Sequence, residues 1–278
     1  MRLSALLQFE VLDQIAPRER HREHVLNRLR AFEFQSNHSF YDEEVYTLLF
    51  VYGFVSQGQK ANATLFKTLT EGSLAPEGLK VWLEMLTIPP RRGSQGESEG
   101  NSQIDLMLGS LEGRAATASG VRYSQPPSGK GSICFVESKW LSDIDIKTTH
   151  DPHRNQWIRV IESALTFQNE RGELPDEVHV TLLTPGIFRD GDYASRFYYY
   201  KYQEYKEDLL CILRELEGAK VQPRAQRDWK YPKLETRLPC LSLHWISFEE
   251  MFKAMPGSDY KDELRRFLKS ADNLLINL

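Results

Sequence analysis

Three charged residues on two short apolar segments form the most informative pattern of this chain. Residues 132–139 are an apolar run that ends in Glu137 and Lys139, two positions apart. An earlier apolar run, residues 103–108, carries a single acid, Asp105. Two carboxylates can share a hard divalent cation, and an adjacent ammonium can position or activate a water. The set is therefore typical of metal-dependent hydrolysis of phosphodiesters.

The spacing of Glu137 and Lys139 suits a strand. Side chains alternate along a strand, so these two point to one face and Ser138 to the other. The chain contains five tripeptides of the form acid-x-Lys, but only Glu137 directly follows a β-branched and aromatic run. The nearest rival is the pair Asp145 and Lys147, whose segment also alternates. Context thus favours Glu137 and Lys139 as the chemical pair.

Composition limits the class of protein. A chain of 278 residues, 41% hydrophobic and 27% charged, fits one large globular domain or one domain with a lobe. No apolar run approaches the roughly 18 residues of a membrane span, and we expect neither a membrane association nor a signal peptide. The three cysteines are widely spaced, which predicts a reducing, cytoplasmic compartment. A net charge of −4 argues against a nucleic-acid coat protein, although a local basic face would suffice for binding.

Periodicity and turn residues predict the elements that position these side chains. Helices are expected over residues 1–34, 39–55, 75–86, 151–168, 196–216 and 247–254. Strands are expected over residues 104–108, 132–138, 177–183 and 241–246. This order predicts an α/β fold with a mixed central sheet flanked by helices. We expect an N-terminal helical segment, residues 1–38, before an α/β domain, residues 39–278, with mobile loops near 89–102 and 115–131.

Asp105, then Glu137-Ser138-Lys139, then a helix, resembles the PD-(D/E)xK nuclease superfamily, whose fold is restriction-endonuclease-like. The resemblance covers roughly residues 39–183. It implies an endonuclease that cleaves DNA with Mg²⁺, which Mn²⁺ could replace, in restriction, repair or defence, and it is compatible with a homodimer. It also implies that Asp105, Glu137 and the Ser138 backbone carbonyl are metal ligands. Lys139 would then orient or polarise the attacking water.

Two further positions follow from the resemblance. The family often adds an acid from an early helix, for which Glu43 and Glu44 are candidates and Glu44 is preferred; the alternative is that both favour the helix dipole. Some branches place a Gln or Arg on the helix after the motif. Gln156 could then hold a water or phosphate, and Arg154 could bind a phosphate oxygen. The alternative is an ordinary helix start, capped by Asp151.

Basic residues near aromatic ones are candidates for holding DNA. Arg91 and Arg92 precede the strand of Asp105, and Arg196 and Lys201 belong to a tyrosine-rich helix. Phosphate contacts need such side chains, and tyrosines can stack on unpaired bases. The alternative for the tyrosines is a helix that packs its aromatic face on the sheet.

Two other functions remain open. The acidic net charge, and Ile104 where the family motif has proline, favour a non-catalytic nucleic-acid- or protein-binding module on the same fold. An unrelated α/β enzyme is the other alternative, but the chain has no Gly-rich phosphate loop and no nucleophile elbow to indicate it.

Overall fold

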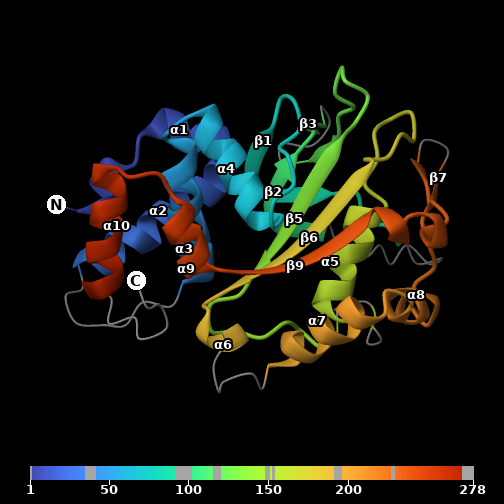
Figure 1. Ribbon diagram of the computed structural model, residues 1–278. Helices are drawn as coiled ribbons and strands as arrows, with labels where there is room; N and C mark the ends of the chain where they lie inside the picture. The colour runs from blue at the N-terminus through green and yellow to red at the C-terminus, as the bar shows by residue number, and fades with distance from the viewer. Residues whose placement is uncertain are drawn as a thin grey trace.

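A five-stranded mixed sheet forms the centre of the protein, as the sequence predicts (Figure 1). The computed structural model describes residues 2–34, 42–91, 102–114, 120–147, 151, 154–190, 196–226 and 229–270. The strand order is β1 (Lys80–Thr87), β2 (Ser102–Gly109), β5 (Ser132–Ser138), β6 (Glu177–Thr184) and β9 (Leu241–Ser247). The first three strands pair antiparallel, and β5, β6 and β9 pair parallel. The two short sheets are β3 (Leu111–Gly113) with β4 (Val121–Tyr123), and β7 (Ala225–Gln226) with β8 (Trp229–Lys230).

Helices cover both faces of this sheet (Figure 1). One group contributes to a hydrophobic cluster that contains Leu106, Val136 and Ile246. Its members are α1 (Phe9–Ile15), α2 (Glu19–Phe34), α3 (Glu43–Val55), α4 (Gln59–Leu69), α9 (Phe248–Ala254) and α10 (Asp259–Ser270). A second hydrophobic cluster lies on the other face of the sheet. The helices that contribute to it are α5 (Gln156–Leu165), α6 (Ile187–Asp190), α7 (Phe197–Glu207) and α8 (Leu210–Glu217). None of the described helices is long and apolar enough to cross a membrane.

Two central elements have sequences that suit complete burial. Every residue of β5 is buried, because this strand lies between β2 and β6 and has helices on both faces. In α3 all residues from Val45 to Phe54 are buried, which explains why its apolar residues surround the helix instead of forming one stripe. Asp42 begins α3 by accepting a hydrogen bond from the backbone of Val45 at 3.1 Å. Both elements are therefore rigid supports for polar residues at their ends.

Three predicted elements are wrong. Residues 75–86 are not a helix: β1 occupies Lys80–Thr87, and the helix of this region, α4, lies earlier. The predicted connection 115–131 contains β4, which pairs with β3; residues 115–119, like 92–101 of the other expected loop, lie outside the described residues. The helix expected over 196–216 is two helices, α7 and α8, separated at Asp208, whose carboxylate accepts a hydrogen bond from the backbone of Leu210.

A local irregularity separates the halves of β1 and β2. The pairing passes from Leu83 opposite Leu106 to Met85 opposite Ile104, and Glu84, which lies between, has a φ of 56°. Leu83 and Leu106 belong to the cluster under α3, whereas Met85 and Ile104 belong to the cluster on the other face. Alternation of side chains is thus reset at Glu84 and at Asp105, which lie opposite each other, while the register of the two strands stays the same. The carboxylates of β1 and β2 lie at this irregularity.

Candidate active site

The structure brings Asp105, Glu137 and Lys139 together where β2 and β5 adjoin. Asp105 Oδ2 accepts a hydrogen bond from the backbone N–H of Ser138 at 2.8 Å. Glu137 Oε1 and Lys139 Nζ are 2.8 Å apart. Glu137 is 1% exposed and Lys139 5%, whereas Asp105 is partly exposed. Asp105 is therefore the least buried residue of this set.

A third carboxylate holds the ammonium of Lys139 from α3. Glu43 Oε1 lies 3.2 Å from Lys139 Nζ, and Glu43 Oε2 accepts hydrogen bonds from Trp140 N at 3.0 Å and Ser142 Oγ at 2.9 Å. Glu44, the preferred acid at the sequence level, instead pairs with Arg28 at 3.6 Å. The first turn of α3 therefore directs Glu43 and not Glu44 toward Lys139, whereas the charge of Glu44 acts on Glu84; the role of Glu44 stays a prediction.

A fourth carboxylate, Glu84, is not predicted from the sequence, because residues 75–86 are expected there to form a helix. It is buried on β1 beside β2 and accepts a hydrogen bond from the Gln103 side chain. A charged residue inside the otherwise apolar segment Val81–Leu86 was the indication that could have revealed it, since a buried charge usually has a functional or structural partner. We call Glu43, Glu84, Asp105, Glu137 and Lys139 the acid cluster.

The electrostatics of the acid cluster favour an added cation. Burial, followed by the charges of Glu137 and Glu84, raises the pKa of Asp105 well above its ordinary value. Burial likewise raises the pKa of Glu84 to about 8. Burial opposes the charge on Lys139, but the carboxylates of Glu137, Asp105 and Glu43 outweigh it and raise the pKa of Lys139. One ammonium thus lies among four carboxyl groups and cannot keep all of them ionised; the raised pKa values of Asp105 and Glu84 favour their protonated forms, which an added cation would reverse.

The side chains partly fit the magnesium ion that the resemblance implies. Among the described residues, no three His, Cys, Asp or Glu side chains are arranged to hold a metal ion. Magnesium, however, is often bound by only one or two carboxylates and keeps several waters. Asp105 and Glu137, adjacent through Ser138 and short of compensating charge, fit such a two-carboxylate site.

The Ser138 side chain turns away from the acids, as alternation predicts. Its hydroxyl lies 2.8 Å from the hydroxyl of Thr47 on α3. The neighbouring backbone N–H of Lys139 donates to Leu183 O at 2.8 Å. Strand β5 is therefore held by α3 through a side chain and by β6 through the backbone, which restricts movement of Glu137 and Lys139.

The residues after the motif do not meet the acid cluster in the predicted way. Gln156 begins α5, and its side chain accepts a hydrogen bond from Asp145 N at 3.3 Å. Arg154 is fully buried in an ion pair with Glu162, so the predicted phosphate contact by Arg154 is wrong. The cation that α5 does bring to the acids is Arg159, whose charge acts with that of Lys139 against the burial that raises the pKa of Glu137.

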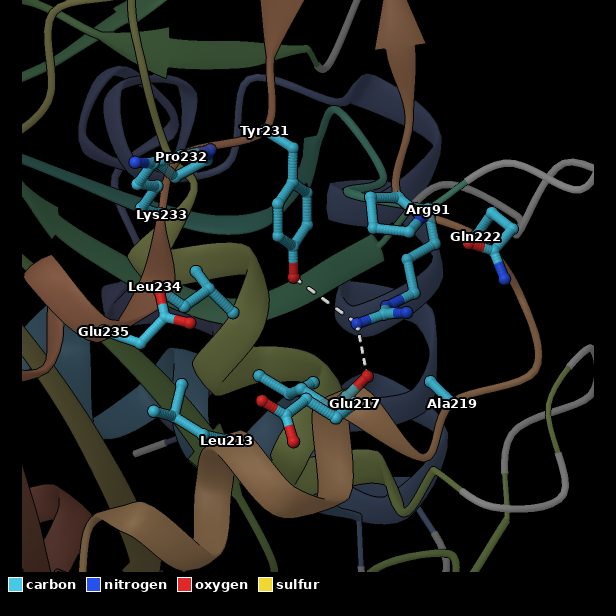
Figure 2. Close-up of a pocket in the computed structure, with 12 residues that line it drawn as sticks. Arg91, Leu213, Glu217, Ala219, Gln222, Tyr231, Pro232, Lys233, Leu234 and Glu235 are labelled. Atoms are coloured by element: carbon cyan, nitrogen blue, oxygen red, sulfur yellow. Dashed lines mark hydrogen bonds between the residues drawn. The ribbon is translucent and has the colours of Figure 1, made fainter.

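Arg91 is also removed from any phosphate-binding role. It is 4% exposed, pairs with Glu162 at 2.7 Å, and donates to the backbone oxygens of Leu216 and Val221. Figure 2 shows its guanidinium beside the ring of Tyr231 on the wall of a cavity of about 440 Å³. That cavity shares no residue with the acid cluster. The sequence prediction for Arg91 fails because a buried carboxylate and two carbonyls occupy its donors.

The remaining predicted DNA contacts have mixed outcomes. Lys201 pairs with Glu204 at 2.8 Å and with Glu215, and its side chain is 17% exposed; its contact with DNA stays a prediction. Arg196 is partly exposed, with its guanidinium 4.9 Å from the centre of the Phe188 ring. Arg92 lies outside the described residues. Of the predicted basic side chains, Arg196 is thus the one that the described structure leaves at the surface without a carboxylate partner.

Only the geometry of the acid cluster indicates a function for this protein. No family model matches the chain, and no curated protein or solved structure matches it.

Proposed function

We propose that the protein is a metal-dependent nuclease of the PD-(D/E)xK type that hydrolyses phosphodiester bonds of DNA. The observation that carries the proposal is the position of Lys139, buried between Glu137 and Glu43 and next to Asp105. Burying one ammonium among several carboxylates costs desolvation free energy, which is offset only where the charges pair with one another or serve a function. Perturbed charged groups that converge from separate elements are frequent at active sites.

Each member of the acid cluster has a proposed role. Asp105, Glu137 and the Ser138 carbonyl would hold Mg²⁺ or Mn²⁺. When bound, the cation would neutralise charge on the phosphate and lower the pKa of a coordinated water. Lys139 would supply a fixed positive charge where the transition state is most negative, and Glu43 would hold its ammonium in place. Since Asp105 is the partly exposed one of the two proposed metal-binding carboxylates, the phosphate would approach from its side.

The test is cleavage of supercoiled plasmid, single-stranded DNA and RNA with Mg²⁺, Mn²⁺ or EDTA. We expect metal-dependent cleavage by the wild type, and a rate at least about 100-fold lower for Lys139→Met and Asp105→Asn. The chain offers matched controls in its exposed acid-x-Lys tripeptide: Asp145→Asn and Lys147→Met should cleave at nearly the wild-type rate. Cleavage that survives both cluster variants, or no cleavage of any substrate by the wild type, would contradict the proposal.

The burial of Glu137 favours one alternative, a binding module without turnover. A carboxylate that is 1% exposed and already paired with Lys139 could serve only to stabilise the fold. Calorimetry with Mn²⁺ separates the two functions. A Mn²⁺ site that is lost in Asp105→Ala supports catalysis, whereas the absence of a site in the wild type supports the module.

The proposed activity also suggests a compartment and an oligomeric state for the protein. Three free cysteines fit a reducing, cytoplasmic compartment, and cleavage of both strands of a duplex would be served by a homodimer. Restriction, repair or defence are the processes in which such cleavage would be used. Light scattering of the purified protein, with and without DNA, tests the pairing.

A further inference from the structure

A row of basic side chains lies along one flank of α2. Val25 and Leu29 on the same helix are buried and define the flank that faces the core. The row lies beside that flank, at spacings of three or four residues that place side chains next to one another on a helix. We call the row the α2 ridge; its members are Arg18, directly before the helix, and His21, His24 and Arg28.

Contacts within the ridge show that its charges are close together. Arg28 donates a hydrogen bond to His24 Nε2 at 3.2 Å. Burial, and then the charges of Arg18, His24 and Arg28, lowers the pKa of His21 to about 4. His21 is therefore neutral at pH 7, and the positive potential that acts on it comes from its neighbours.

Both ends of the ridge contact neighbours of the acid cluster. At one end, Arg18 Nη1 lies 3.5 Å from Gln103 Oε1, and the amide nitrogen of Gln103 donates to Glu84. At the other end, Arg28 pairs with Asp42, the cap of α3 and the residue before Glu43. The ridge therefore runs from β2 to the first turn of α3, alongside the acids.

The arginines of the ridge retain the capacity to bind an anion. A guanidinium has five N–H donors, so pairing of Arg28 with carboxylates does not use all of them. The Arg28 side chain is 43% exposed, and Arg18 is partly exposed. Ten residues of helix separate the two arginines by about 15 Å. That length compares with about four nucleotides of one strand, at roughly 3.4 Å of axial rise each.

A polyanionic substrate needs such a surface. The acid cluster offers a phosphate one ammonium, the chain carries a net charge of −4, and the side chains of Arg91, Arg154 and Lys201 are 17% exposed or less and paired with carboxylates. Affinity for nucleic acids comes largely from cations that contact phosphates. We propose that the α2 ridge binds the phosphate backbone of the nucleic-acid strand that is cleaved at the acid cluster. This inference rests on the proposed nuclease function.

The experiment measures binding without cleavage. Fluorescence anisotropy of labelled duplex DNA, single-stranded DNA and RNA oligonucleotides is followed in EDTA and in Ca²⁺. The salt concentration is raised from about 50 to about 300 mM, a range over which phosphate contacts weaken strongly. Arg18→Gln and Arg28→Gln should each weaken binding several-fold and reduce the slope of log K against log salt by about 0.9 on duplex DNA. Arg20→Gln and Arg30→Gln remove the same charge from other, exposed flanks of α2 and should leave the slope unchanged.

The outcomes separate the two proposals. A wild type that binds none of the oligonucleotides contradicts the nuclease function itself. A wild type that binds, with equal losses in ridge and control variants, overturns the ridge and leaves the nuclease function intact. Arg28→Gln also removes the ion pair with Asp42, so the folding of this variant is checked by circular dichroism. If Arg28→Gln unfolds, Arg18→Gln is the decisive variant, because Arg18 has no carboxylate partner among the described residues. An NMR titration of His21 should show its pKa rise when the oligonucleotide binds.

Discussion

Glu43 Oε1 and Lys139 Nζ lie 3.2 Å apart although the two residues are separated by 96 positions in the chain. The other oxygen of Glu43 binds the backbone of Trp140 and the hydroxyl of Ser142. One carboxylate therefore joins the start of α3 to the ammonium and to the segment that follows β5. This contact makes Glu43 a positioning residue for Lys139.

Replacing Glu43 should reduce cleavage far more than replacing its neighbour. Glu43→Gln removes the charge that holds the Lys139 ammonium, and we expect a rate roughly 10- to 100-fold lower, since small misplacements of a catalytic group cost about that much. Glu44→Gln removes an ion pair with Arg28 and should change the rate by no more than about threefold. Initial rates of plasmid nicking in Mg²⁺ measure both. Equal rates for the two variants would show that the contact of Glu43 with Lys139 has no catalytic role.

The difficulty of choosing between Glu43 and Glu44 from the sequence has a physical cause. Consecutive residues of a helix point about 100° apart, and an apolar stripe normally tells which faces the core. Residues Val45 to Phe54 of α3 are all apolar or buried, so the helix has no stripe from which its rotation could be read. The strands of Asp105 and Glu137, in contrast, are predicted correctly, because a short apolar run that carries a single acid is distinctive.

The protonation of Glu84 should make stability depend on pH. Its ordinary pKa is 4.5 and burial raises it to about 8 in the folded protein, so between these values the folded state binds more protons than the unfolded state. The free energy of unfolding therefore falls as pH rises from 4.5 to 8. Glu84→Gln removes this titration and should be more stable than the wild type by about 4 kcal/mol at pH 8, and by less than about 1 kcal/mol at pH 5.

Urea denaturation in EDTA at the two pH values checks this expectation. The exposed Glu77, on the segment that leads into β1, is the matched control, and Glu77→Gln should leave both values unchanged. A stability difference for Glu84→Gln that is the same at pH 5 and pH 8 would mean that Glu84 is already ionised in the folded protein.

Removing the carboxylate of Glu162 should destabilise the protein strongly. Glu162 pairs with Arg91 and Arg154, and it accepts a hydrogen bond from the hydroxyl of Tyr231. Glu162→Gln removes the carboxylate that pairs with two buried guanidiniums, and the loss of one partner of a buried ion pair costs about 3–5 kcal/mol. Glu217→Gln, at the exposed rim of the cavity in Figure 2, should stay within about 0.5 kcal/mol of the wild type. Urea denaturation at pH 7 measures both variants; a loss below about 1 kcal/mol for Glu162→Gln would disprove the expectation.

The same network explains why the sequence alone does not show which basic residues are available to contact DNA. Arg91 and Glu162 are 71 positions apart, and Lys201 and Glu215 are 14 apart. A local pattern of Arg and Lys beside aromatic residues does not distinguish a surface that binds phosphate from cations paired inside the fold. Pairing of this kind depends on how α5, α7 and α8 pack, which only the tertiary structure provides.

Acid should destabilise the protein through His179. Its Nδ1 lies 3.0 Å from Nε2 of His244, and His244 Nδ1 lies 2.9 Å from Glu71. Burial, and then the charge of His244, lowers the pKa of His179 from 6.5 to about 4. Between these values the unfolded state binds more protons, so the free energy of unfolding should fall as pH decreases from 6.5 to about 4.

The test is the variant His179→Gln, which can keep a hydrogen bond to His244. Its free energy of unfolding should fall by roughly 1–3 kcal/mol less than that of the wild type over this pH range. Urea denaturation from pH 4 to 7 provides the curves, and parallel curves for wild type and His179→Gln would assign the acid sensitivity to groups other than His179.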